Sequence, residues 1–189
     1  MQPQDVIKFW FEELEPSQWF RGGDEVDELI RSRFAALLEQ VHEGAHDGWA
    51  VTPQGRLALV LTLDQFPRNL YRGQARAFAY DEKALALVLG GLQQKADHEL
   101  GPHQRAFFYL PLEHSESLEM QDLSLSHYAG LVLTAPPDQR GPLRNYLEFA
   151  WKHYAIIKRF GRYPHRNDIL GRTSSDEEQE FLKGPDSSF

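Results

Sequence analysis

Apolar residues recur at spacings of three and four along several segments, a pattern that predicts helices with one buried face. The first of these segments begins at Asp24 and ends before Gly44 and Gly48, and its acidic first turn suits the helix dipole. Two further segments repeat the pattern near residues 85–96 and 143–157. The apolar positions of the first are Val26, Leu29, Ile30, Phe34, Leu37, Leu38 and Val41.

The segment RLALVLTLDQF, residues 56–66, is compatible with either a strand or a helix. Leucines occupy every second position from Leu57 to Leu63, as in a strand. Leucine and alanine with a single valine nevertheless favour a helix, buried because it is apolar on all sides. Since proline disfavours helical backbone in the residue before it, Pro67 is expected to end this helix near Phe66.

Capping residues mark the starts of two more helices. Ser115 is a plausible N-cap, with Glu116 in the first turn, for a helix that continues to about Leu133. Ser174 or Ser175 can begin a short last helix with an acidic first turn. About eight short amphipathic helices predict an all-α fold of stacked helical hairpins. At 189 residues we expect one domain over residues 1–183, followed by a loose tail over residues 184–189.

Composition narrows the class of protein. A hydrophobic fraction of 41% and a charged fraction of 25% are those of a globular protein. The chain has no cysteine, which excludes disulfides, thiolate metal sites and a cysteine nucleophile. The N-terminal residues lack the basic region of a secretory signal, and no apolar run approaches the roughly 20 residues of a membrane helix. We therefore expect a soluble, cytoplasmic protein without a membrane partner.

Charge is spread unevenly along the chain. The net charge of −8 argues against nucleic acid as a partner, because phosphate backbones favour basic surfaces. Between Lys158 and Arg172, however, five Lys or Arg residues accompany a single Asp. This local excess indicates a site in the segment RFGRYPHRNDILGR, residues 159–172.

The same segment also carries signals of a helix boundary. Gly161 is expected to end one helix, and Pro164 to start another with His165, Arg166 and Asn167 in its first turn. Free backbone N–H groups at a helix N-terminus, with arginines beside them, would bind phosphate or carboxylate. The alternative is that the arginines only neutralise nearby acidic helices. So many donors in so few residues favour the anion site.

Residues 42–46, His-Glu-Gly-Ala-His, match the zinc-binding pattern H-E-x-x-H. On a continuous helix, His42 and His46 would share one face. Gly44 lies inside the motif where the helix is expected to end, and no suitable third ligand is evident. We therefore interpret the motif as a solvated helix terminus and predict no metal site and no cofactor.

Two other polar segments each allow a functional and a structural interpretation. His114 and Glu116 can form an acid/base pair or part of a metal site, or they can be a packed loop residue and a helix-capping carboxylate. The segment Asp64–Asn69, which follows a buried helix, can line a pocket at the edge of the core. A structural turn in which Asp64 pairs with Arg68 is slightly favoured for that segment.

Several of these segments together resemble one family. LDQFPRNLYRG, RAFFYLPLEHSESLEMQ and HYAIIKRFGRYPHRNDILGR, followed by EEQEFL, are similar to the bacterial family catalogued as domain of unknown function 924. The resemblance covers essentially the whole chain. It implies an all-α fold like that of tetratricopeptide repeats, with helical hairpins in layers, and it brings no established activity. The signature positions are Asp64, Gln65, Pro67, Arg68, Asn69, Arg72, His114, Glu116, Gln121, His153, Arg159, Gly161, Arg162, His165, Arg166, Asn167, Gly171 and Arg172.

Three hypotheses of function follow. The first is a pocket, shared by the three polar motifs, that binds a small anionic ligand and supports acid/base chemistry. The second is an interaction module that holds acidic peptides or C-termini. The third is a buried hydrogen-bond network without a ligand. In the first, the acid/base candidates are His114, Glu116 and His165, and the ligand-binding candidates are Arg68, Arg72, Gln121, His153, Arg159, Arg162, Arg166 and Asn167. Whether the chain is an enzyme, and its oligomeric state, stay open at this point.

Overall fold

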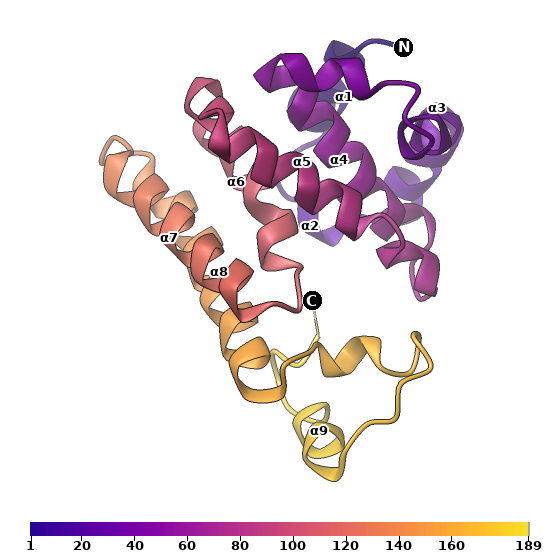
Figure 1. Ribbon diagram of the computed structural model, residues 1–189, viewed down its shortest axis with the longest axis vertical. Coiled ribbons are helices and arrows are strands. Elements are labelled where there is room, and N and C mark those ends of the chain that lie inside the picture. Colours follow the sequence, from indigo (N-terminus) through magenta and orange to yellow (C-terminus); the bar gives the residue numbers. More distant parts are fainter. Residues whose placement is uncertain (189) are drawn as a thin grey trace. The chain divides into compact units, whose positions relative to one another are not determined.

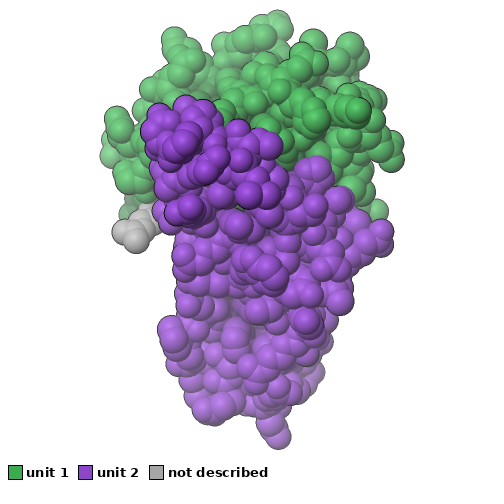
Figure 2. Space-filling view, turned by 90° about the vertical axis from the view of Figure 1, so that its left-hand side faces the viewer, with its two compact units in different colours: residues 1–111 green, residues 112–189 purple. Residues whose placement is uncertain are grey.

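A computed structural model describes residues 1–188 of the chain. Every regular secondary-structure element within these residues is a helix (Figure 1). This confirms the predicted all-α class. The chain divides into two compact units, residues 1–111 and residues 112–189 (Figure 2). A single domain over residues 1–183, and a layering like that of tetratricopeptide repeats, stay predictions. No helix in the described part of the chain is both long enough and apolar enough to cross a membrane.

The first unit is built around one helix, α4 (Pro53–Leu70), which packs against α1, α3 and α5. Every residue of α4 from Gly55 to Pro67 is buried, which explains why its sequence is apolar on all sides and resembles a strand. The other elements of this part are α1 (Pro3–Lys8), η1 (Phe9–Glu13), α2 (Gln18–Arg21), α3 (Asp24–His42), η2 (Asp47–Val51), η3 (Ala75–Phe78), α5 (Asp81–Gln93), η4 (Ala96–Glu99) and α6 (Pro102–Glu113), the last two residues of which belong to the second unit.

Aromatic side chains fill the core of the first unit. The ring centroid of Phe34 lies 4.9 Å from the centroids of both Phe9 and Phe66. The ring centroids of Trp10 and Phe107 are 5.6 Å apart, and these two rings meet edge-on. All five are buried. Tilted and edge-on pairs of this kind are favourable arrangements of aromatic rings, so these contacts fix how η1, α3, α4 and α6 pack together.

Pro67 does not end α4 near Phe66, as the sequence predicted, because the helix continues to Leu70. A proline inside a helix removes one backbone donor. Here side chains bind carbonyl groups near the proline: Arg68 Nη1 donates to Asp64 O (2.7 Å) and Asn69 Nδ2 to Gln65 O (3.0 Å). Burial of Pro67 and Leu70 also keeps this last turn in place. Tertiary packing therefore outweighs the local preference.

The second unit contains the helical hairpin of α7 (Leu118–Thr134) and α8 (Arg140–Phe160), which pack side by side (Figure 1). It ends with the short turn η5 (Pro164–Arg166) and α9 (Asp176–Phe181). Gly161, at φ 69°, ends α8 in the left-handed conformation that glycine favours. Ser175 caps α9 in a reciprocal pair with Glu178. These two boundaries are confirmed.

Two predicted helix starts are wrong. α7 begins at Leu118 with Ser117 as its N-cap residue, so Glu116 precedes the helix. The Ser115 hydroxyl instead accepts a bond from the backbone N of Ser117 (3.3 Å). Pro164 begins only a three-residue 3-10 turn, too short to provide the helix N-terminus expected at the anion site. In the predicted tail, Ser187 Oγ donates to Leu182 O (3.3 Å), and Phe189 lies outside the described residues.

Two adjacent glycines in α5 provide a test of packing around α4. A Cβ atom on Gly91 would lie 2.6 Å from Arg56 Cδ and 2.7 Å from Phe108 Cζ, whereas one on Gly90 would meet only Arg56 Nη1, at 3.4 Å. Alanine is favoured over glycine in a helix by about 1 kcal/mol, while overpacking costs about 1–3 kcal/mol. We expect urea denaturation to show that Gly91→Ala lowers the free energy of unfolding and that the control Gly90→Ala leaves it equal or higher. Equal effects of the two substitutions would contradict this packing.

Candidate functional site

Polar side chains from four segments of the second unit converge around Tyr163. We call this set the Tyr163 cluster; it consists of Glu113, His114, Glu116, Gln121, His153, Tyr163, His165, Arg166 and Arg172. The end of α6 and the loop after it supply the first three, α7 supplies Gln121 and α8 supplies His153. The others come from η5 and the loops on either side of it. Two of the three motifs singled out in the sequence therefore meet.

Two histidines and one arginine lie around the fully buried ring of Tyr163, and a third histidine lies beside one of them. The ring centroid of Tyr163 is 5.6 Å from that of His153 and 5.5 Å from that of His165. The ring of His153 is in turn 6.2 Å from that of His114. The guanidinium carbon of Arg166 lies 4.4 Å from the centroid of the Tyr163 ring, a cation–π contact. The structure thus brings together the imidazoles of His114, His153 and His165.

Three hydrogen bonds hold Tyr163 in place, two at its hydroxyl and one at its backbone N. Its hydroxyl donates to the backbone oxygen of Glu113 and accepts from Gln121 Nε2 (3.0 Å). Its backbone N donates to Glu116 Oε1 (2.8 Å). Burial raises the pKa of Tyr163, so the phenol stays protonated and acts as a donor. Gln121 Nε2 also donates to the backbone oxygens of Glu113 (2.7 Å) and Ser115 (2.8 Å), which joins α7 to the end of α6.

Glu116 forms a bidentate ion pair with Arg172. The two carboxylate oxygens lie 2.7 and 2.9 Å from Nη1 and Nη2 of the guanidinium. Burial by itself would raise the pKa of Glu116, but the bonds from Arg172 and from the backbone N of Tyr163 outweigh it and lower this pKa. The predicted acid/base candidate Glu116 is therefore an ionised carboxylate that anchors the loop containing Tyr163.

Glu113 and His153 form a buried contact. His153 Nδ1 lies 3.1 Å from Glu113 Oε1 and 2.9 Å from the backbone oxygen of Phe149. Burial, and then the neighbouring His114, lower the pKa of His153, so the imidazole is neutral at pH 7. The contact with Glu113 is therefore not an ion pair at pH 7. Sequence reasoning missed Glu113, although a carboxylate directly before His114 at the end of an apolar helix was a usable signal.

His165 is likewise neutral at pH 7. Burial, followed by the positive charge of Arg166, lowers the pKa of His165 to about 4. Arg166 is itself buried, with 7% of its surface exposed. A neutral imidazole beside a buried guanidinium therefore occupies the turn η5, where the sequence placed the anion site.

The other arginines of the basic segment hold α9 and its preceding loop. Arg162 makes a bidentate ion pair with Glu178, at 2.7 Å for both bonds, and donates to the backbone oxygen of Thr173 (2.9 Å). Arg159 pairs with the exposed Glu177 (2.9 Å). The buried Asn167 donates from Nδ2 to Ser174 Oγ (3.1 Å). Three predicted ligand-binding residues thus have structural partners in this segment.

The predicted residues of the first unit are also paired. Arg68 binds Asp81 through two bonds of 2.9 and 3.0 Å and lies 3.4 Å from the buried Asp64. The exposed Arg72 lies 3.0 and 3.1 Å from the two carboxylate oxygens of Asp27. Asp64 and Arg68 therefore lie close together, as the structural alternative predicted, but within the last turns of α4 and not across a separate turn. A pocket shared by these residues and the Tyr163 cluster stays a prediction.

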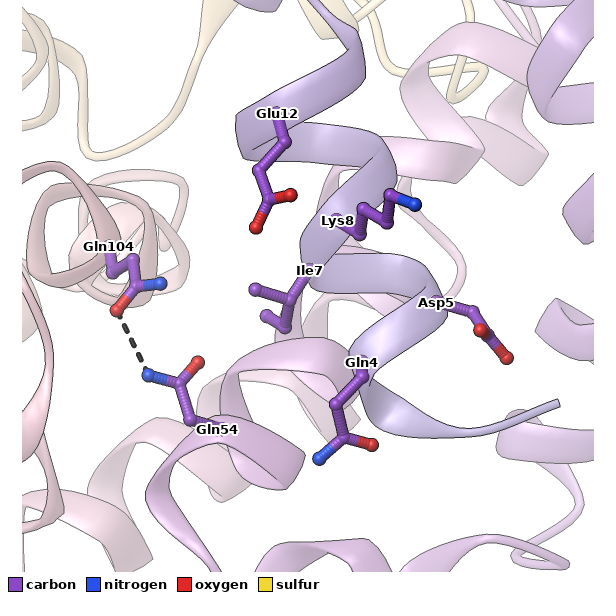
Figure 3. A pocket seen from close by; sticks show the side chains of 7 residues that line it. All are labelled: Gln4, Asp5, Ile7, Lys8, Glu12, Gln54 and Gln104. Carbon is purple, nitrogen blue, oxygen red and sulfur yellow. Dashed lines mark hydrogen bonds between the residues drawn. The ribbon is translucent and has the colours of Figure 1, made fainter.

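Two hollows on the surface of the first unit contain none of the predicted site residues. The larger, of about 380 Å³, is bordered by a hydrogen bond between Gln54 and Gln104 (3.1 Å) (Figure 3). The smaller, of about 250 Å³, is lined by aromatic rings such as Phe11 and Trp19. Neither brings together several groups with shifted pKa values. We place the candidate site at the Tyr163 cluster because perturbed histidines and carboxylates converge there.

The H-E-x-x-H motif does not lie on one helical face. α3 ends at His42, and the residues after it form turns. The ring of His42 packs edge-on against that of Tyr80 at 5.0 Å, while His46 Nε2 lies 3.1 Å from Gln40 Oε1. The two imidazoles therefore have separate neighbours, as expected for a helix terminus.

Comparison with known proteins identifies the family of this chain. The model of the family described as bacterial proteins of unknown function, DUF924, matches residues 6–186. The chain belongs to DUF924. A solved structure of a protein of unknown function, ATU0120 from Agrobacterium tumefaciens, is similar to this chain, with 33% sequence identity and a TM-score of 0.86. The match covers 96% of this chain and 97% of that one. Among curated protein sequences, none matches this DUF924 chain.

The pair of Glu178 and Arg162 makes the stability of this DUF924 protein depend on pH. The bonds from Arg162 lower the pKa of Glu178 to about 2. A lowered folded-state pKa stabilises the fold above the unfolded-state value, about 4.3, and this contribution is lost as pH falls toward 2. We expect Glu178→Gln to lower the Tm by a few degrees at pH 7, and the difference from wild type to shrink between pH 4.5 and 2.

The matched control for this pair is Glu177→Gln, which removes an exposed carboxylate from the same turn of α9. Exposed ion pairs contribute little to stability, so its Tm should stay near that of the wild type at every pH. Thermal unfolding followed by circular dichroism measures both variants. A Tm deficit of Glu178→Gln that does not change with pH would count against this role of the ion pair.

Proposed function

We propose that this protein binds a small anionic molecule, bearing a phosphate or carboxylate group, at the Tyr163 cluster. The observation that carries the proposal is that the imidazoles of His153 and His165 and the buried guanidinium of Arg166 lie around one tyrosine ring, with the imidazole of His114 beside that of His153. A positive charge removed from water attracts an anion more strongly than an exposed one does. The planar guanidinium also suits bidentate binding of either group.

The proposal divides the predicted residues into two roles. Arg166 would contact the anion, together with His114 and His165, which we assign to proton transfer because an imidazole both donates and accepts protons. His153, whose Nδ1 lies 2.9 Å from the backbone oxygen of Phe149, would pack beside His114 and Tyr163 and hold them in place. Gln121, Arg162 and Asn167 would position this set, since their hydrogen bonds fix the loops that carry it. Arg159 lies in an exposed ion pair, and such a pair can exchange its carboxylate for a ligand at little cost.

Burial favours a small ligand over an extended acidic peptide. A peptide needs an open groove lined by exposed donors. Arg166 and His153 are 7% and 5% exposed, and the histidines lie close to one another. Such a set suits a molecule small enough to be enclosed, which is why we prefer this function to that of an interaction module.

Isothermal titration calorimetry tests the proposal, with inorganic phosphate, pyrophosphate and succinate titrated into metal-depleted protein. We expect at least one of these anions to bind, and Arg166→Lys to weaken its Kd at least about tenfold, or about 1.4 kcal/mol, because lysine lacks the guanidinium fork. The control Arg144→Lys changes an exposed arginine of α8 and should bind like the wild type.

The outcomes separate ligand binding from folding. If Arg166→Lys loses its helical circular dichroism, His165→Gln provides a second test and should also weaken binding. A wild type that binds none of the three anions would refute the proposal, as would unchanged affinity in both variants. Equal losses in Arg166→Lys and Arg144→Lys would indicate a nonspecific charge effect and would also contradict it.

A further inference from the structure

Glu113, His114 and His153 place three metal-ligating atoms close together. One atom from each side chain, a carboxylate oxygen or an imidazole nitrogen, lies within 4.8 Å of the other two. The residues come from the end of α6, the position after it and the middle of α8. Because α6 and α8 are separate helices, their contact is fixed by the fold and not by sequence spacing alone.

The kinds of donor determine which ions the group suits. Two imidazoles and one carboxylate form a donor set found in catalytic zinc sites, where a fourth position remains for water or substrate. Imidazole nitrogen favours zinc, cobalt, nickel and iron over magnesium and calcium, which prefer oxygen ligands. The set in this chain therefore suits a divalent transition-metal ion better than a hard cation.

The surroundings of these residues are ordered in the way that a metal site requires. The backbone oxygen of Glu113 accepts bonds from both Gln121 and Tyr163, which fixes the end of α6. His153 Nδ1 faces two oxygens, those of Phe149 and Glu113. Since a carbonyl or carboxylate oxygen only accepts, the proton lies on Nδ1 and the lone pair on Nε2. Metal-binding histidines commonly donate their other N–H to such an oxygen.

Two of the three ligands are enclosed and one is open to solvent. Glu113 is 3% exposed and His153 is 5% exposed. His114 is half-buried, so one ligand can be reached from solvent.

We infer that Glu113, His114 and His153 form a binding site for a divalent transition-metal ion such as Zn²⁺, with at least one coordination position left for water or another ligand. The sequence left His114 and Glu116 open as part of a metal site, but it predicted no bound metal and did not bring Glu113 and His153 into such a site. The inference stands independently of anion binding, because it rests on the donor set and its geometry. A metal at this place would also give an anionic molecule bound nearby a second positive partner.

Metal binding is tested on the full chain, freed of metal by chelation and dialysis, in a buffer without phosphate or carboxylates. Titration with Zn²⁺ by calorimetry, and with Co²⁺ by visible absorption, should show one saturable site. The Co²⁺ spectrum reports its nitrogen and oxygen ligands. Glu113→Gln keeps the shape of the side chain but removes its charge, so we expect its Kd to be at least about tenfold weaker, a difference of about 1.4 kcal/mol.

His114→Asn provides the second variant, because His114 is half-buried and its change disturbs the core less. The matched control is the double variant His42→Asn, His46→Asn, which removes the other histidine pair near a glutamate. It should bind one metal ion with the wild-type Kd. Circular dichroism verifies that each variant is folded, and any variant that is not is left out of the comparison.

Three results would overturn the inference: no saturable metal binding by the wild type, unchanged affinity in the folded Glu113→Gln and His114→Asn variants, or loss of binding in the His42 and His46 double variant. Failure of the anion proposal is distinguishable from these. Anion titrations use metal-depleted protein and the Arg166→Lys variant, whereas metal titrations contain no anionic ligand. We expect Arg166→Lys to retain metal binding.

Discussion

The fully buried side chain of Tyr163 lies where four segments of the second unit meet. Its hydroxyl joins the end of α6 to Gln121 of α7, and its backbone N binds Glu116 in the loop between those helices. Its ring contacts His153 of α8 and carries the guanidinium of Arg166. A buried phenol must find partners for its polar atom, and Tyr163 does so while its ring packs against both His153 and His165. The positions of these two imidazoles therefore depend on that single side chain.

The basic segment around Tyr163 consists of two kinds of arginine. Arg162 and Arg172 form bidentate pairs with Glu178 and Glu116, and these pairs hold the chain after α8 against α9 and the loop before α7. Arg166 instead lies over an aromatic ring among imidazoles. The hypothesis that arginines neutralise acidic helices therefore accounts for the first kind, and the hypothesis of a ligand site concerns the second. The excess of basic residues in the segment 159–172 therefore includes arginines with structural roles and one candidate ligand-binding arginine.

The sequence predicted those features that depend on local chemistry. The helix from Asp24, the end of α8 at Gly161 and the cap at Ser175 follow from periodicity and capping, and all are confirmed. It failed where tertiary contacts outweigh local preference, as at Pro67, which burial keeps inside a helix, and at Pro164, which begins only one turn. Glu113 was missed because its contact with His153 joins residues that are forty positions apart, and no periodicity signals such a pair. The resemblance to DUF924 marked His114 and His153 without saying that both lie near the same carboxylate.

Electrostatics connects the two kinds of ligand considered for the cluster. The carboxylate of Glu113 is buried beside His153, which is neutral at pH 7, and the buried guanidinium of Arg166 lies over the ring of Tyr163, whose hydroxyl donates to the backbone oxygen of Glu113. Because charges interact strongly when removed from water, a cation bound near Glu113 would be repelled by Arg166 unless an anion lay between them. An anion bound at Arg166 would in turn be repelled by Glu113 unless a cation shielded that carboxylate. A metal ion and an anionic molecule would therefore each strengthen the binding of the other, and by thermodynamic linkage the two coupling factors would be equal.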